Sequence, residues 1–248
     1  MELEFIRPNL LNNGIVESYF TLKNNVLENG VVKGLNLGFN TIDEEAIVSA
    51  NRSLLLRTLN LDIEQFATAQ QIHSNEVIYV EKGGMYENVD GLVTNKDNIA
   101  IAIQVADCGA VLIADTINKV IGAAHAGWRG ARSGVIENTI ELMKKYGGEP
   151  DNMNVFISPC ISLRNFEVGK EVATQFPDEV VDYEHFTKPH IDLVQYIRTK
   201  VEELGVSSER IEVNGRCTVE ESNSFYSYRR EKEKSGRMMG IIKLTPNV

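Results

Sequence analysis

Four chemically reactive side chains stand at the ends of one apolar segment, VADCGAVLIADTINKVIGAAHAGWRGARSGV. Asp107 and Cys108 precede the apolar run GAVLIA. His125 and Arg129 stand at and just after the end of the next apolar run, VIGAAHA. The polar residues DTINK between these two runs predict a turn around Asn118. An antiparallel hairpin returns one run alongside the other, so we expect Cys108 and His125 to face each other at its open end.

A third candidate ligand is His73, in the stretch QQIHSNEVIYV just before another predicted strand. With Cys108 and His125 it makes a set of one thiolate and two imidazoles, and three protein ligands with an open fourth position are typical of catalytic zinc. Zinc in such a site lowers the pKa of a bound water or polarises a substrate oxygen. The spacing matches no short metal motif, so two interpretations stay open: a zinc site, or a small buried thiol and two separately satisfied histidines.

The segment AGWRGARSGV, which follows His125, has features of an anion site. Two glycines and two arginines, Arg129 and Arg132, stand where a helix is predicted to begin. Exposed N–H groups at a helix start and the forked guanidinium both favour phosphate. A glycine-rich turn with two solvated arginines fits the same letters, and only the nearness of Cys108 and His125 favours the anion site.

Composition restricts the class of protein. The chain has 248 residues, 43% hydrophobic and 24% charged, with a net charge of −10. Such an acidic chain, with one interrupted basic run, is not expected to bind nucleic acid. No apolar stretch is long enough for a membrane span, the first residues do not resemble a signal peptide, and three cysteines do not suggest a disulfide framework. We therefore expect a cytoplasmic protein that acts on a small molecule.

Helical and strand patterns are mixed along the chain. A capping box, with Thr41 as N-cap and Glu44 reaching back, predicts a helix that begins at residue 41. The other predicted helices lie within 130–148, 169–177 and 191–205, and the predicted strands within 76–81, 91–95, 101–107, 154–159, 210–215 and 238–244. Since there is no strict βαβ alternation, no repeat and no linker, we predict an α+β fold with a mixed β-sheet core, in a single domain over residues 1–248.

Common catalytic motifs are missing from the sequence: it contains no H-E-x-x-H, no G-x-x-x-x-G-K-[ST] and no G-x-S-x-G. The stretch SPCISL begins like the P-C-x-x-C of zinc nucleobase deaminases, but Leu163 stands where the second cysteine is required. The sequence therefore does not fit that deaminase class.

Five blocks of sequence nevertheless resemble one known family. QIHSNEV, ADCGAVLIAD, AAHAGWRG, ISPCIS…FEVG and RCTVEESNSFYSYRREKEKSGRMMGIIKL are similar to the signature blocks of YfiH-type laccase-domain proteins, and they span about Asn36 to Leu244 in family order. Members have been called multicopper polyphenol oxidoreductases and purine nucleoside phosphorylases. The resemblance implies mixed β-sheets flanked by helices, with His73, Cys108 and His125 as zinc ligands.

The resemblance also implies a reaction: cleavage of adenosine- or inosine-type nucleosides by phosphate to a free base and ribose-1-phosphate. Adenosine deaminase and methylthioadenosine phosphorylase activities are possible additions. The catalytic residues would be Cys108, His125 and Asp107, the last as an acid/base or ligand-orienting group, although a strand-end Asp that caps a turn is the simpler interpretation. The substrate- and phosphate-binding residues would be Arg129, Arg52, Gln71 and Asn75.

Two other activities compete with phosphorolysis. One is a copper-dependent, laccase-like polyphenol oxidase, which the family's older name suggests. Four histidines in the whole chain are few for several copper sites, so copper is the less favoured metal. The other is a metal-free hydrolase with Cys108 as nucleophile and His125 as base, which leaves His73 without a role. The expected partners are a purine nucleoside and phosphate, with neither nucleic acid nor membrane.

Overall fold

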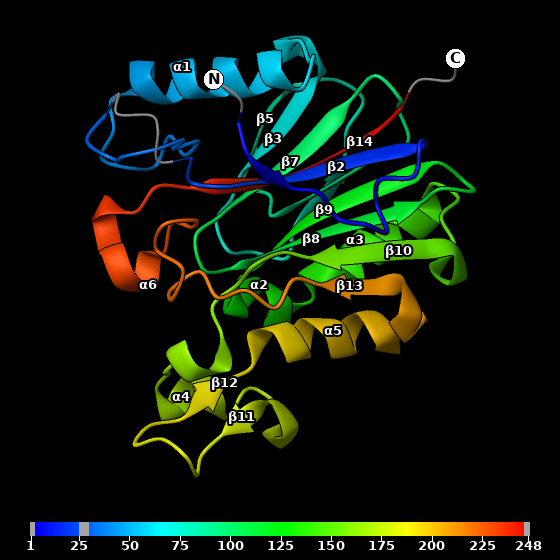
Figure 1. Ribbon diagram of the computed structural model, residues 1–248. Helices are drawn as coiled ribbons and strands as arrows, with labels where there is room; N and C mark the ends of the chain where they lie inside the picture. Colours follow the sequence, from blue (N-terminus) through cyan, green and yellow to red (C-terminus); the bar gives the residue numbers. More distant parts are fainter. Residues whose placement is uncertain (1–2, 25–29, 246–248) are drawn as a thin grey trace.

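A computed structural model describes residues 3–24 and 30–245. Two six-stranded sheets lie against each other, with α1 over one outer face and α3 and α5 over the other (Figure 1). The first sheet has the order β1 (Phe5–Ile6), β2 (Val16–Thr21), β14 (Met238–Leu244), β7 (Ala100–Val105), β3 (Phe66–Gln70), β5 (Gly84–Glu87). The second has the order β13 (Ile211–Val213), β10 (Met153–Ile157), β8 (Gly109–Asp115), β9 (Val120–Ala126), β6 (Gly91–Thr94), β4 (Val77–Tyr79).

Both sheets are mixed. In the first, β14 is antiparallel to β2 and β7, whereas β3 is parallel to β5 and β7. In the second, β8 is antiparallel to β9 and β10, whereas β4 and β13 pair in parallel with β6 and β10. The helices are α1 (Glu45–Thr58), α2 (Trp128–Ser133), α3 (Val135–Lys145), α4 (Lys170–Ala173), α5 (Leu193–Glu203) and α6 (Tyr228–Glu231), and β11 (Val181–Asp182) pairs with β12 (His190–Ile191). The predicted single-domain α+β fold with helix-flanked mixed sheets is confirmed.

The hydrophobic core has three layers. The one between the sheets includes Ile103 of β7, Leu112 of β8 and Phe156 of β10. A second lies between the outer face of the second sheet and α3 and α5, and a third lies beneath α1. Every residue of β8 and β9 is buried, because this hairpin has a packed layer on each face. Strands covered on both faces read as continuous apolar runs, which is why the hairpin stands out in the sequence.

Two predicted helices differ from the structure. The first begins at Glu45, and its N-cap Glu44 makes no side-chain cap hydrogen bond, so the capping-box prediction is wrong. The Thr41 hydroxyl instead donates to the carbonyl of Gly38, in the loop before the helix. The helix predicted within 130–148 is divided into α2 and α3 at Gly134, whose φ of +97° is left-handed. Glycine adopts this conformation without steric cost, so it ends one helix and turns the chain into the next.

The turn at residues 116–119 joins β8 to β9 as predicted. Of the remaining predicted elements, β14 has the predicted bounds, β7 and β10 begin one residue earlier than predicted, and the others are shorter. The sequence patterns missed β1, β2, β3 and β5 of the first sheet, and also the short pair β11–β12. Among the described residues, none of the helices has both the length and the apolarity that crossing a bilayer requires.

Candidate metal and substrate site

The β8–β9 hairpin places two of the predicted ligands together. Ala110 is directly opposite His125 in the hairpin register, and Cys108 lies two residues before Ala110, in the turn that joins β7 to β8. Residues two apart on a strand point to the same face, so Cys108 extends the edge at which His125 lies. His125 is almost fully buried, and Cys108 is partly buried.

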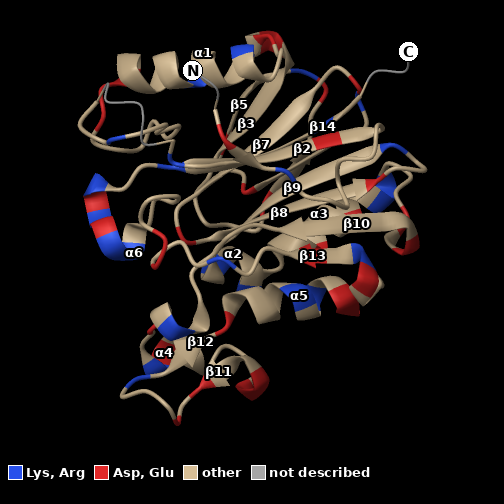
Figure 2. Cartoon of the chain, viewed as in Figure 1, with Lys and Arg blue, Asp and Glu red and all other residues tan. Residues whose placement is uncertain are grey.

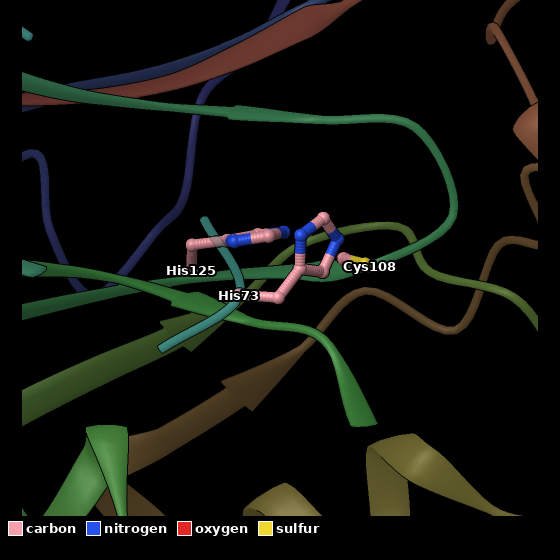
Figure 3. A group of neighbouring side chains, drawn as sticks. All are labelled: His73, Cys108 and His125. Carbon is pink, nitrogen blue, oxygen red and sulfur yellow. The ribbon is translucent and has the colours of Figure 1, made fainter. Parts of the chain in front are cut away.

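His73 reaches the same point from the segment between β3 and β4 (Figure 3). Its ring lies edge-on to that of His125, with 4.7 Å between the centroids. One donor atom each from His73, Cys108 and His125 can be chosen so that all three lie within 4.8 Å of one another. His73 is exposed on its outer side, so the cluster has one buried side and one side open to solvent. The structure thus brings together the three residues that the sequence singled out.

A fully buried carboxylate, Asp90, links the two histidines. It accepts hydrogen bonds from the backbone N–H groups of Ile72, His73 and Ser74, at 3.1, 3.0 and 2.7 Å, and from the Ser74 hydroxyl at 2.8 Å. It also lies 2.7 Å from Nδ1 of His125. Sequence reasoning missed this residue. The available signal is a lone aspartate directly before the wholly buried strand β6.

Mutual electrostatics shift the pKa values of this cluster. Burial alone would raise the pKa of Cys108, but the charges and hydrogen bonds of His125 and His73 outweigh it and lower that pKa to about 6. Burial likewise opposes the charging of His125, but the Cys108 thiolate and Asp90 raise its pKa to about 9. Hydrogen bonds from His125 and Ser74 hold the pKa of Asp90 at about 2 against the effect of burial. Without metal, these mutual shifts favour a thiolate at Cys108 beside an imidazolium at His125.

The residues around the cluster fit a metal ion of the zinc type. A thiolate with two imidazoles is a common donor set for zinc, and the open side leaves a fourth position for water or substrate. Gly127, directly after β9, makes this arrangement sterically possible. A Cβ at residue 127 would lie 2.9 Å from Sγ of Cys108 and 3.2 Å from Cδ2 of His73, closer than ordinary van der Waals contact.

Two predicted site residues, Asp107 and Gln71, form hydrogen bonds to distant parts of the chain. Asp107 has a left-handed φ of +81°, and its carboxylate accepts hydrogen bonds from the Thr218 hydroxyl and the Arg229 N–H, both at 2.6 Å. It thereby fastens α6 and the segment before it to the turn that carries Cys108. The side-chain amide of Gln71 exchanges two hydrogen bonds with the backbone of Gln104, at 2.7 and 2.8 Å. Catalytic and substrate-binding roles for these two residues stay predictions.

Two more predicted residues, Arg129 and Asn75, lie on α2 and beside its end. Arg129 is exposed, and its guanidinium lies 4.4 Å from the centroid of the Trp128 ring. Asn75 donates from its amide to the carbonyl of Ser133 at 2.7 Å, which ties the His73 segment to the end of α2. Whether either residue binds substrate stays a prediction.

Arg52 is placed differently from Arg129. It lies on α1, is 9% exposed, and donates from Nε to the carbonyl of Leu37 at 2.9 Å. The ring of Phe39 covers its guanidinium at 4.2 Å, and its buried Nη2 has no hydrogen-bond partner within the described part of the chain. Burial lowers the pKa of Arg52 to about 10, which still leaves it charged at neutral pH.

A second arginine, Arg237, contacts the same loop as Arg52 and was not predicted. Its side chain packs on Gly38, where an added Cβ would lie 2.4 Å from Cγ of Arg237, and its guanidinium lies 5.9 Å from the ring centroid of Tyr228. Burial lowers the pKa of Arg237, and the negative charges of Cys108 and Asp107 partly oppose that shift. From Glu231, at the end of α6, to Lys234 in the turn that follows, acidic and basic residues alternate (Figure 2). No ion pair of Arg52 or Arg237 occurs among the described residues.

Comparison with known proteins gives a consistent family. The family model described as multi-copper polyphenol oxidoreductase laccase matches residues 17–245. A purine nucleoside phosphorylase of Deinococcus radiodurans is 36% identical over 242 residues, which cover 96% of this chain and 91% of that protein. Purine nucleoside phosphorylase YlmD of Bacillus subtilis is 30% identical over 248 residues, which cover 93% of this chain and 89% of that protein.

Solved structures share the fold over nearly the full length. YlmD from Geobacillus stearothermophilus superposes with a TM-score of 0.90 at 26% identity, covering 98% of this chain and 96% of that one. Protein NMB0706 of Neisseria meningitidis gives a TM-score of 0.86 at 30% identity, covering 98% of this chain and 99% of that one.

Proposed function

The chain belongs to the multi-copper polyphenol oxidoreductase laccase family, and on that premise we propose that it is a zinc-dependent purine nucleoside phosphorylase. The observation that carries the proposal is the cluster of His73, Cys108 and His125, which is backed by a buried carboxylate and open on one side. The names of the relatives supply the substrate class, purine nucleosides and phosphate.

The proposed reaction exchanges one bond at the sugar. A phosphate oxygen forms a bond to C1′ while the bond from C1′ to the purine nitrogen breaks, and the leaving base takes up a proton. The transition state resembles an oxocarbenium ion, so an anion held close to C1′ stabilises it electrostatically. His73, Cys108 and His125 would hold the zinc ion, which when bound supplies a Lewis acid for an anion, a water or a sugar hydroxyl.

We assign phosphate binding to Arg52 rather than Arg129. Arg52 is buried and charged, has no ion-pair partner among the described residues, and donates to the carbonyl of Leu37, whose N–H donates to the carbonyl of Arg237. An isolated buried charge is costly, and a bound phosphate would compensate it. Arg129 is exposed to water and gains less from pairing. Removal of one charge-assisted hydrogen bond costs about 1.5–3 kcal/mol, so Arg52→Gln should raise the KM for phosphate by roughly 10- to 150-fold. Arg129→Gln should change it much less, and the reverse order would contradict the assignment.

The decisive experiment is chromatography of adenosine incubated with zinc-loaded protein, with and without phosphate. Adenine and ribose-1-phosphate formed only with phosphate, and lost in Cys108→Ala, would support phosphorolysis at this site. Cys217→Ala is the matched control, because Cys217 is a buried free thiol outside the cluster. No product from adenosine, inosine or methylthioadenosine would refute the proposal.

The same assay separates the alternatives. Inosine formed from adenosine without phosphate would indicate a deaminase. Oxidation of a phenol by the copper-loaded protein would indicate the oxidase. Hydrolysis that survives chelation would indicate the metal-free enzyme, for which the ion pair of Cys108 and His125 provides an activated nucleophile.

A further inference from the structure

One carboxylate contacts both histidines of the cluster. Oδ1 of Asp90 accepts from the backbone N–H of His73 at 3.0 Å and lies 2.7 Å from Nδ1 of His125. Oδ2 accepts from Ile72 N–H, Ser74 N–H and the Ser74 hydroxyl. The carbonyl of Asp90 also accepts from the backbone N–H of His125 at 2.7 Å. Asp90 is thus hydrogen-bonded to the backbone of both histidines and to the ring of one.

We propose that Asp90 is the positioning residue of the metal site, which fixes His73 through its backbone and His125 through its ring. The proposal rests on the metal site of the proposed function but not on phosphorolysis. At His125, a hydrogen bond from Nδ1–H to Asp90 leaves Nε2 as the nitrogen available to a metal ion. At His73, the backbone has a left-handed φ of +60°, which is uncommon for a residue other than glycine. The three consecutive N–H groups that Asp90 accepts hold that turn in place.

The chemistry of the contacts requires a carboxylate. All of the groups that face Asp90 are hydrogen-bond donors, and the two carboxylate oxygens share them. An asparagine side chain has one oxygen and one NH₂ group. In either orientation its NH₂ would face donors, at the ring of His125 or at the backbone of Ser74. Asp90→Asn therefore keeps the size of the side chain but disturbs one of the two histidines.

The test is zinc affinity, measured by competition with a chelating indicator on purified full-length protein. Asp90→Asn should weaken zinc binding by roughly 10- to 100-fold, which is typical for loss of a carboxylate behind a histidine ligand. Asp115→Asn is the matched control, because Asp115 is equally buried and accepts four hydrogen bonds at the far end of β8. It should lower stability without lowering zinc affinity. Equal zinc affinity of Asp90→Asn and wild type, or an equal loss in Asp115→Asn, would overturn the proposal.

A second measurement needs no variant and covers the case in which Asp90→Asn does not fold. In zinc-loaded wild type labelled with ¹⁵N, the ring of His125 should show a proton on Nδ1 and a metal-bound Nε2. A proton on Nε2 would overturn the proposal. Failure of the proposed function is distinguishable from this: zinc binding that depends on Asp90, in a protein without phosphorolysis, refutes the activity alone. Wild type that does not bind zinc refutes the metal site itself, and with it both proposals.

Discussion

Gly127→Ala tests the site by adding one methyl group. Gly127 has φ −75° and ψ 165°, a conformation that alanine adopts freely, so the backbone does not oppose the change. The new Cβ would lie 2.9 Å from Sγ of Cys108 and 3.2 Å from His73, whereas ordinary contact begins at 3.4 Å. Overpacking of this kind costs about 1–3 kcal/mol. The metal-free protein can relieve it by turning the Cys108 side chain away, but zinc binding brings Sγ back.

The expected result is therefore a loss of zinc affinity with a smaller loss of stability. A cost of about 1–3 kcal/mol that is paid on binding corresponds to a roughly 5- to 150-fold weaker zinc complex. Zinc affinity is measured by indicator competition, and stability of the metal-free protein by urea unfolding. Gly215→Ala is the control, since nothing lies within 4 Å of its added Cβ. Wild-type zinc affinity in Gly127→Ala would show that Cys108 does not bind the metal from this position.

Two further predictions concern neighbouring residues. In metal-free protein, alkylation of Cys108 should rise as pH increases through about 6, because the thiolate forms above its lowered pKa, and zinc should suppress the reaction. Burial raises the pKa of Cys160, so that thiol should stay unmodified. A midpoint near 9 for Cys108 would contradict the thiolate–imidazolium pair. Gln71→Ala should lower the free energy of unfolding by about 1–3 kcal/mol in urea titrations, because it leaves the partly buried backbone of Gln104 without two hydrogen bonds. Unchanged stability with a raised KM for nucleoside would instead indicate substrate binding.

The meeting of Cys108, His125 and His73 could be predicted from sequence because two of these residues belong to one hairpin. Its strands are buried on both faces and therefore appear as apolar runs, and the short turn after Asp115 fixes their antiparallel pairing. That pairing alone brings Cys108 next to His125. His73 was added only by residue type, since nothing local to its stretch shows where the loop lies in the fold.

The residues that position the cluster could not be predicted in this way. Asp90 is 35 residues from His125 and 17 from His73, and it meets them only because β6 pairs with β9 in the second sheet. Sheet order is set by packing of the whole domain, which local patterns do not record. The same limit applies to the hydrogen-bond partners of Asp107. The sequence shows only a carboxylate beside a cysteine, whereas in the fold Asp107 holds a segment more than a hundred residues away.

Hydrogen bonds from distant parts of the chain hold two strained backbone turns, one on each side of the cluster. His73 and Asp107 have φ values of +60° and +81°, and a left-handed conformation costs a residue with a side chain about 1–2 kcal/mol. Hydrogen bonds to a carboxylate contribute about 1.5–3 kcal/mol each, and several act at each turn: those of Asp90 on residues 72–74, and those that Asp107 accepts from Thr218 and Arg229. The hydrogen bonds therefore outweigh the strain. Glycine would remove the strain at either position, but it could not supply the imidazole of the one or the carboxylate of the other. These two turns keep strained side chains because the site needs them.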